Sequence, residues 1–193
     1  PNFYGPQRFG DGGANVEAGY ELLRGGSRVQ DRWLRRFLLS SFQSYLCNIY
    51  LAQRLARGLF GQLLSGDVAK KYATGGMFDV VDVAVEDPRY QAHEISFTAP
   101  IYGPKMWSAS GEAGALEAAV LEAQQLTLED FGRVKVEGSR RLGRLLVPEI
   151  EAEVSAEGLV LRFFLPKGAY ATTVMREFMK LELTDAPVVD GDE

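Results

Sequence analysis

A run of apolar residues at helical spacing is the feature that most constrains how this chain folds. Leu34, Leu38, Phe42, Tyr45 and Ile49 recur every three or four residues, and Asp31 stands before them as an N-cap. The pattern predicts one long amphipathic helix from Asp31 to about Leu55. Its aromatic residues are predicted to lie in the core rather than to form a stacking platform; they are Trp33, Phe37, Phe42, Tyr45 and Tyr50.

Three further helices are predicted. One runs from Val16 to Leu23 and ends at the Gly25-Gly26-Ser27 break. Another extends from Glu112 to about Leu128, in a segment rich in good helix formers. A final helix opens with Tyr170, Val174 and Phe178 at i, i+4 spacing.

The β-type patterns are shorter. Between Gly61 and Pro104 we expect irregular strands and loops, with a valine-rich strand at 80–85 that ends at Asp87-Pro88. The alternation at 134–136 predicts another strand. Two alternating runs, 150–154 and 159–165, flank a polar turn and predict an antiparallel hairpin with one face packed on a core.

Composition narrows the class of protein. The chain has 193 residues, of which 46% are hydrophobic, enough for one good core or two small ones. No segment approaches the roughly 20 apolar residues of a membrane span, and no secretion signal opens the chain, so we expect a cytoplasmic protein without membrane contact. A single cysteine, Cys47, and a single histidine, His93, exclude an internal disulfide and a metal site built from several Cys and His ligands.

His93 stands near Glu94 and Ser96, but neighbours along a strand point to opposite faces and do not form a catalytic triad. We expect an ordinary hydrogen-bonded histidine. The glycines Gly10 and Gly12 do not match a dinucleotide fingerprint, because Asn15 stands where that motif needs glycine. A tight turn explains them.

The net charge of -5 is concentrated at the C-terminus, whose last twelve residues hold five acidic residues and no basic one. The rest of the chain is therefore neutral, and we expect a solvated acidic tail. Basic residues gather in two runs, predicted to be solvated faces or, as a second choice, a rim that contacts phosphates. The runs are Arg24, Arg28, Arg32, Arg35 and Arg36, and Arg133, Lys135, Arg140, Arg141 and Arg144.

Two signature segments identify a family. The first is Asn2-Phe3-Tyr4-Gly5-Pro6-Gln7-Arg8-Phe9-Gly10, and the second runs from Leu165-Pro166-Lys167-Gly168 through Tyr170 and Thr172 to Arg176-Glu177. Together they resemble the TruD-type tRNA pseudouridine synthases, and the resemblance extends to about Lys180. Usual members have Tyr then Phe at the first aromatic pair and Phe in the second segment, whereas this chain has Phe3-Tyr4 and Tyr170.

The resemblance implies an α+β fold in which a pseudouridine synthase catalytic domain, with an antiparallel or mixed sheet, is divided into two pieces. Residues 1–27 form the first piece, 28–146 an inserted α/β TRUD domain, and 147–193 the C-terminal piece with the acidic tail. It also implies tRNA as partner, no metal and no organic cofactor. We expect a monomer.

The resemblance also implies roles for six residues. Tyr4 and Tyr170 supply aromatic walls for a flipped uridine, and Asn2 hydrogen-bonds the substrate near the reaction centre. Arg8, Lys167 and Arg176 meet nearby phosphates or carboxylates. The alternative is that Arg8 only braces the loop and that Arg176 pairs with a neighbouring acid.

The family's catalytic aspartate lies in a Gly-x-Lys-Asp segment that we expect before Pro1, so this chain alone is predicted to be inactive. Three function classes remain open. One is the C-terminal portion of a synthase that acts on uridine 13 of tRNA, and another is an RNA-binding module without catalysis. The third, an unrelated small-molecule enzyme, has no supporting residues.

Overall fold

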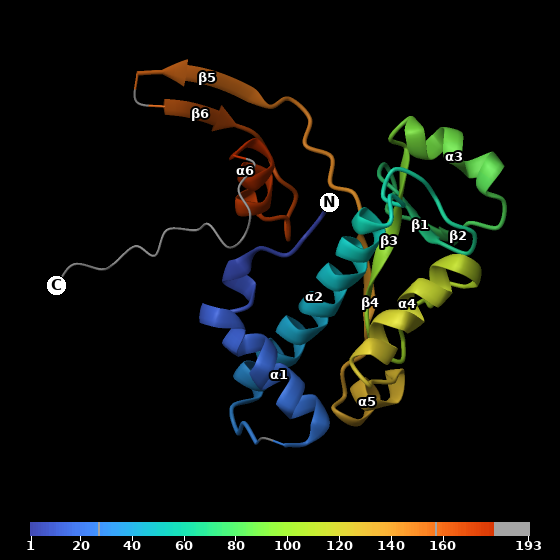
Figure 1. Cartoon of the computed structure of the whole chain (residues 1–193), viewed down its shortest axis with the longest axis vertical. Coiled ribbons are helices and arrows are strands. Elements are labelled where there is room, and N and C mark those ends of the chain that lie inside the picture. The colour runs from blue at the N-terminus through green and yellow to red at the C-terminus, as the bar shows by residue number, and fades with distance from the viewer. Residues whose placement is uncertain (27, 157, 180–193) are drawn as a thin grey trace.

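The computed structural model describes residues 1–26, 28–156 and 158–179, and its centre is the long helix α2 (Arg32–Ala56). Asp31 caps that helix by accepting a hydrogen bond from the Leu34 amide at 2.7 Å. Two short 3-10 turns, Pro6–Arg8 and Asp11–Gly13, lead into α1 (Ala14–Arg24), which packs along α2 (Figure 1). The acidic tail lies outside the described residues.

The contact between α1 and α2 depends on Gly19. A Cβ atom there would lie 2.3 Å from the backbone oxygen of Leu38, so only glycine lets the helices approach this closely. Leu22 and Leu23 of α1 share one hydrophobic core with Phe42 and Leu46 of α2. The core therefore runs across the expected boundary at residues 27 and 28, and the domain limits stay a prediction.

A four-stranded antiparallel sheet covers another side of α2, in the order β2-β1-β3-β4. The strands are β1 (Val68–Lys71), β2 (Met77–Asp79), β3 (Ile95–Ile101) and β4 (Ser139–Leu142). Six of the seven residues of β3 are buried, because α2 packs on this central strand. The remaining helices of this part are α3 (Val83–Gln91), α4 (Gly111–Ala123) and α5 (Leu128–Arg133).

Two predicted strands are wrong. Val83 and Val85 lie in α3, because the Asp82 side chain accepts from the amides of Ala84 and Val85 and starts a helix there. The segment 134–136 forms a turn in which Lys135 has a φ of 63°, and the strand starts only at Ser139. In both places local backbone bonding overrides the alternation of valines.

The predicted hairpin is present as β5 (Glu151–Ser155) and β6 (Gly158–Arg162), and it is followed by α6 (Ala171–Met179). Its register pairs Ala152 with Leu161 and Val154 with Leu159. The prediction that one face packs on a core is wrong for the described residues, because Val154 is 84% exposed and Leu159 is 49% exposed.

The long helix also corrects the prediction for its aromatic residues. Phe42 and Tyr50 are buried as expected, but Trp33 is 73% exposed and Tyr45 is 36% exposed. At 3.6 residues per turn, Trp33 and Phe42 lie about two and a half turns apart on opposite sides of the helix, so they cannot both face the same core.

Candidate functional site

The two signature segments lie side by side, although 154 residues separate them along the chain (Figure 1). The rings of Tyr4 and Tyr170 meet edge to face, with centroids 5.7 Å apart and planes at 62°. The hydroxyl of Thr172 donates to the side-chain oxygen of Gln7 at 3.2 Å. The fold thus brings together the two tyrosines that the sequence assigned to one pocket.

Gly5 sets how closely the segments approach. A Cβ atom at this position would lie 2.5 Å from Gln7 Oε1, 2.7 Å from Thr172 Oγ1 and 2.8 Å from a ring carbon of Tyr170. Any larger residue would push the second segment away from the first. Close packing of the two segments therefore explains why the first signature has glycine at position 5.

Arg141 in β4 joins both segments. Its Nε donates to the backbone oxygen of Asn2 at 2.8 Å, and its Nη2 donates to Asn2 Oδ1 at 2.7 Å and to the Gly168 oxygen at 3.0 Å. The guanidinium carbon also lies 4.0 Å from the centroid of the Tyr4 ring. One side chain from the middle of the chain thus binds both signatures and stacks on an aromatic wall.

Asn2 is buried and bound to the same strand. Its side-chain amide donates to the Leu142 oxygen at 2.9 Å, and its backbone amide donates to the Gly143 oxygen at 2.9 Å. With Arg141 bound at its Oδ1, Asn2 braces the loop. The predicted contact of Asn2 with substrate stays a prediction.

The long helix holds the other edge of the first segment. Asn48 of α2 accepts from the Tyr4 amide at 2.9 Å and donates to the Tyr4 oxygen at 3.0 Å, as a backbone neighbour in a sheet would. Burial raises the pKa of Tyr4, and the nearby Arg141 charge lowers it by less. The Tyr4 hydroxyl is therefore neutral at physiological pH and can donate a hydrogen bond.

The three predicted cationic residues differ in their surroundings. The guanidinium of Arg8 bonds to the hydroxyls of Ser40 and Ser44 and lies 5.0 Å from the Phe37 ring centroid, so it braces the loop on α2. Lys167 is exposed in the turn before α6, and Arg176 is half-buried within α6. Lys167 is thus the one of these three that solvent reaches most freely.

Sequence reasoning missed Asn48 and did not single out Arg141. Two arginines of the second basic run, Arg140 and Arg144, are bound within the protein and do not form a solvated face or a rim. Arg140 is buried and bonds to Glu117 Oε1 at 2.6 Å, and Arg144 donates to the backbone oxygens of Tyr90 and Ile95. No local signal distinguishes these arginines from surface ones, because their partners come from distant segments.

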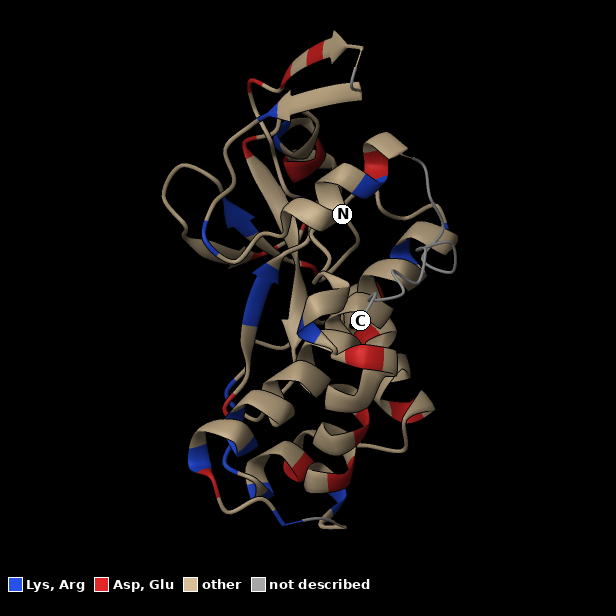
Figure 2. Cartoon of the chain, turned by 90° about the vertical axis from the view of Figure 1, so that its left-hand side faces the viewer, with Lys and Arg blue, Asp and Glu red and all other residues tan. Residues whose placement is uncertain are grey.

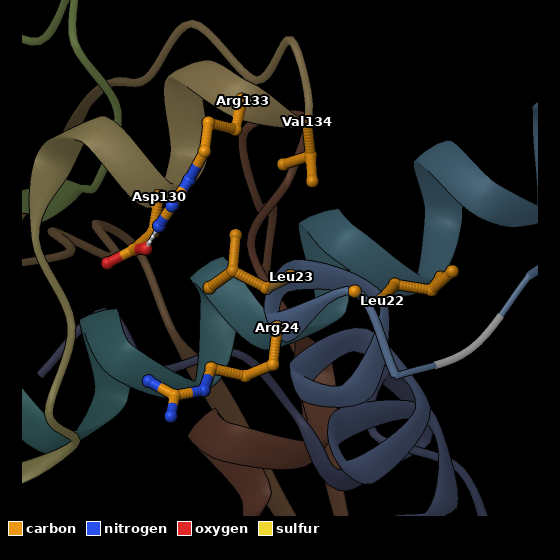
Figure 3. Close-up of a pocket in the computed structure, with 7 residues that line it drawn as sticks. Leu22, Leu23, Arg24, Asp130, Arg133 and Val134 are labelled. Atoms are coloured by element: carbon orange, nitrogen blue, oxygen red, sulfur yellow. Dashed lines mark ion pairs between the residues drawn. The ribbon is translucent and has the colours of Figure 1, made fainter.

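A hollow of about 480 Å³ lies between the end of α1 and α5, away from the signature segments (Figure 3). Leu22, Leu23 and Val134 line it, and an ion pair of Asp130 with Arg133 stands at one side. It contains none of the predicted site residues. Within the described ranges no three His, Cys, Asp or Glu residues are grouped to hold a metal ion, and no helix is long and apolar enough to cross a membrane.

The fold matches that of a solved structure. A crystal structure from Methanosarcina mazei that carries the TruD name superposes with a TM-score of 0.78 over 94% of this chain and 61% of the other, at 24% identity. The fold is therefore that of this class of α+β protein: helices packed on antiparallel sheet.

Comparison at the level of sequence identifies the family. Residues 27–178 match the family model of tRNA pseudouridine synthase D (TruD). Proteins named tRNA pseudouridine synthase D are 47% identical in Anaeromyxobacter dehalogenans over 94% of this chain, and 48% identical in Thermus thermophilus over 96%. The chain belongs to the TruD family. It spans about half the length of these curated relatives, 54% and 51% respectively.

Proposed function

We propose that this chain acts as the C-terminal portion of a tRNA pseudouridine synthase whose substrate is uridine 13 of tRNA. Family membership supports the reaction class. The observation that carries the proposal is the meeting of Tyr4 and Tyr170 beside Arg141, because it brings the two signature segments together from distant parts of the chain. The roles proposed for individual residues rest on the resemblance to the family.

The reaction breaks the bond between C1′ of the ribose and N1 of uracil and forms a bond between C1′ and C5. The proton on C5 leaves and N1 gains one, so atoms and charge balance without an added reactant. The base must leave the helical stack, at a cost of a few kcal/mol that stacking on aromatic side chains offsets. In this proposal Tyr4 and Tyr170 are the aromatic walls that the base stacks on.

The nucleophilic aspartate comes from a Gly-x-Lys-Asp segment, and none of the ten aspartates of this sequence stands in such a segment. We assign that step to the part of the relatives that this chain does not span. Asn2 and Arg141 keep the loop in place, and Lys167, exposed in the turn, contacts a phosphate next to the flipped nucleotide. Arg176 and Arg8 play supporting roles.

A synthase of full family length that carries this chain tests the proposal. We expect it to convert uridine 13 of an unmodified tRNA transcript to pseudouridine, mapped by carbodiimide modification and primer extension. Tyr170→Ala lowers kcat by at least tenfold, whereas Tyr170→Phe retains the ring and most of the activity. The 193-residue chain alone forms no pseudouridine.

The alternative function is an RNA-binding module without catalysis. A full-length protein that binds tRNA but leaves uridine 13 unchanged would favour that alternative. Pseudouridine formed by this chain alone would overturn the assignment of the nucleophile to another segment.

A further inference from the structure

One face of α2 continues from the signature loop to a stacked aromatic pair, the partly buried Phe37 and the exposed Trp33. Asn48 holds Tyr4, and Ser44 and Ser40 hold Arg8, so these positions face the loop. Phe37 and Trp33 follow at the same helical spacing toward the start of the helix. At about 1.5 Å per residue, Trp33 lies about 22 Å along the helix from Asn48.

Trp33 is unusual for its exposure. Its ring stacks on Phe37 with centroids 5.5 Å apart and planes at 8°, yet the residue is 73% exposed. The Phe37 ring also has the Arg8 guanidinium near it, 5.0 Å from its centroid. Arg8, Phe37 and Trp33 thus form a continuous stack that ends in an open tryptophan ring, and core packing does not explain where that ring stands.

The charge around this stack is basic. Arg28, Arg32 and Arg36 are all exposed, and Arg36 stands three positions after Trp33, which makes them neighbours on the helix surface. Two acids lie near these arginines: Asp31 caps α2, and Glu137, which is near Arg36, pairs with Lys105. Figure 2 shows both basic and acidic segments at this lower end of the molecule, and the arginines named above are among the basic ones. The patch complements phosphates on either side of a stacked base.

We propose that Trp33 is a stacking platform for an unpaired base of the RNA, and that Arg32 and Arg36 contact the phosphates that flank this base. The proposal rests on the proposed function, because it takes RNA as the partner. It adds a second contact point about 22 Å along α2 from Asn48, which holds Tyr4, so that RNA follows this face of the helix and is held at two points. Aromatic and cationic groups in alternation are the usual means of binding single strands.

Tryptophan emission tests the platform directly. The chain contains two tryptophans, Trp33 and Trp107, so Trp107→Phe leaves Trp33 as the reporter. Titration of this variant with an unmodified tRNA transcript is expected to quench the Trp33 emission and to saturate at the Kd obtained from anisotropy of labelled tRNA. In the opposite variant, Trp33→Phe with Trp107 retained, quenching is expected to be weak.

Affinity gives an independent measurement. Trp33→Ala is expected to raise the Kd for tRNA on the order of tenfold, and Trp33→Phe to raise it less because the ring remains. Arg36→Ala is expected to lower the slope of log Kd against log salt by about 1. Arg57→Ala is the matched control, since Arg57 is an exposed arginine at the other end of the same helix. It should leave both values nearly unchanged.

The outcomes separate the platform from the function. If tRNA binds but Trp33 is not quenched, or Arg57→Ala and Arg36→Ala weaken binding equally, the platform is wrong and the proposed function stands. If the chain does not bind tRNA at all, both fail for this chain. If the mass in solution doubles and Trp33→Ala abolishes this doubling, the ring is an interface between copies and the proposal is overturned.

Discussion

The guanidinium of Arg141 lies 4.0 Å from the centroid of the Tyr4 ring and donates two hydrogen bonds to Asn2, two positions before that tyrosine. It also reaches Gly168 in the second signature. A side chain from β4 therefore decides how the two signature segments sit relative to each other, and through Asn2 it fixes the backbone that presents Tyr4.

Arg141→Ala removes these contacts together. We expect the free energy of unfolding to fall by about 2–3 kcal/mol, because Asn2 Oδ1 loses its charged donor at a buried site. Urea unfolding of the purified chain measures this change. Arg162→Ala removes an exposed ion pair with Glu153 and should cost less than about 1 kcal/mol. Equal losses in the two variants would contradict the bridging role.

Gly5→Ala tests the close approach of the two segments. The added methyl group collides with Tyr170, Gln7 and Thr172, so we expect faster amide hydrogen exchange in residues 165–172 and a loss of stability of about 1–3 kcal/mol. Gly61→Ala is the control, since a Cβ atom there has no neighbour within 4 Å. Unchanged exchange in 165–172 after Gly5→Ala would show that the segments do not meet in solution.

Arg54 is fully buried at the end of α2 and pairs with the fully buried Asp67 at 2.7 Å. Its guanidinium also bonds to the oxygens of Leu59 and Gln62 and lies 3.7 Å from the Phe97 ring centroid. Removing one partner of such a pair leaves a buried charge without compensation.

We therefore expect Arg54→Met to lower the free energy of unfolding by about 3–5 kcal/mol, measured by urea denaturation. The double variant Arg54→Met with Asp67→Asn removes both charges and should recover part of the loss. If the stability lost in the double variant equals the sum of the losses in Arg54→Met alone and Asp67→Asn alone, the two residues are not coupled.

Cys47 is fully buried in the folded protein. Burial raises the pKa of its thiol from an ordinary 9.0 to about 12, so at pH 8 only about one molecule in ten thousand carries the thiolate. We expect no reaction with a thiol-specific disulfide reagent in buffer at pH 8 and full reaction in denaturant. Because the folded pKa is the higher one, this thiol contributes stability below pH 9.0 that is lost as pH rises toward 12.

If one equivalent of the thiol-specific reagent reacts within seconds in native buffer, Cys47 is not buried in solution. Cys47→Ser provides the blank for the reagent. The free energy of unfolding of Cys47→Ser is a second check. It should be lower than that of the unchanged chain, because a hydroxyl in place of a buried thiol puts a polar group into an apolar site.

The sequence by itself determined the parts of this protein that local spacing encodes. The run from Leu34 to Ile49 predicted α2, helix-forming composition predicted α4, and the alternating runs around the turn at 155–158 predicted the pairing of β5 with β6. The two signatures gave the family, which the comparisons confirm. Each of these signals is contained within a few consecutive turns or one hairpin.

Only the tertiary structure decided which side chains of a pattern do which task. Arg140, Arg141 and Arg144 stand within five positions, yet each bonds to different distant elements. Trp33 and Phe42 are both aromatic residues of α2, but they lie on opposite sides of the helix, and only Phe42 meets the core. A guanidinium or an indole takes its role from what lies against it, and those neighbours come from segments far along the chain.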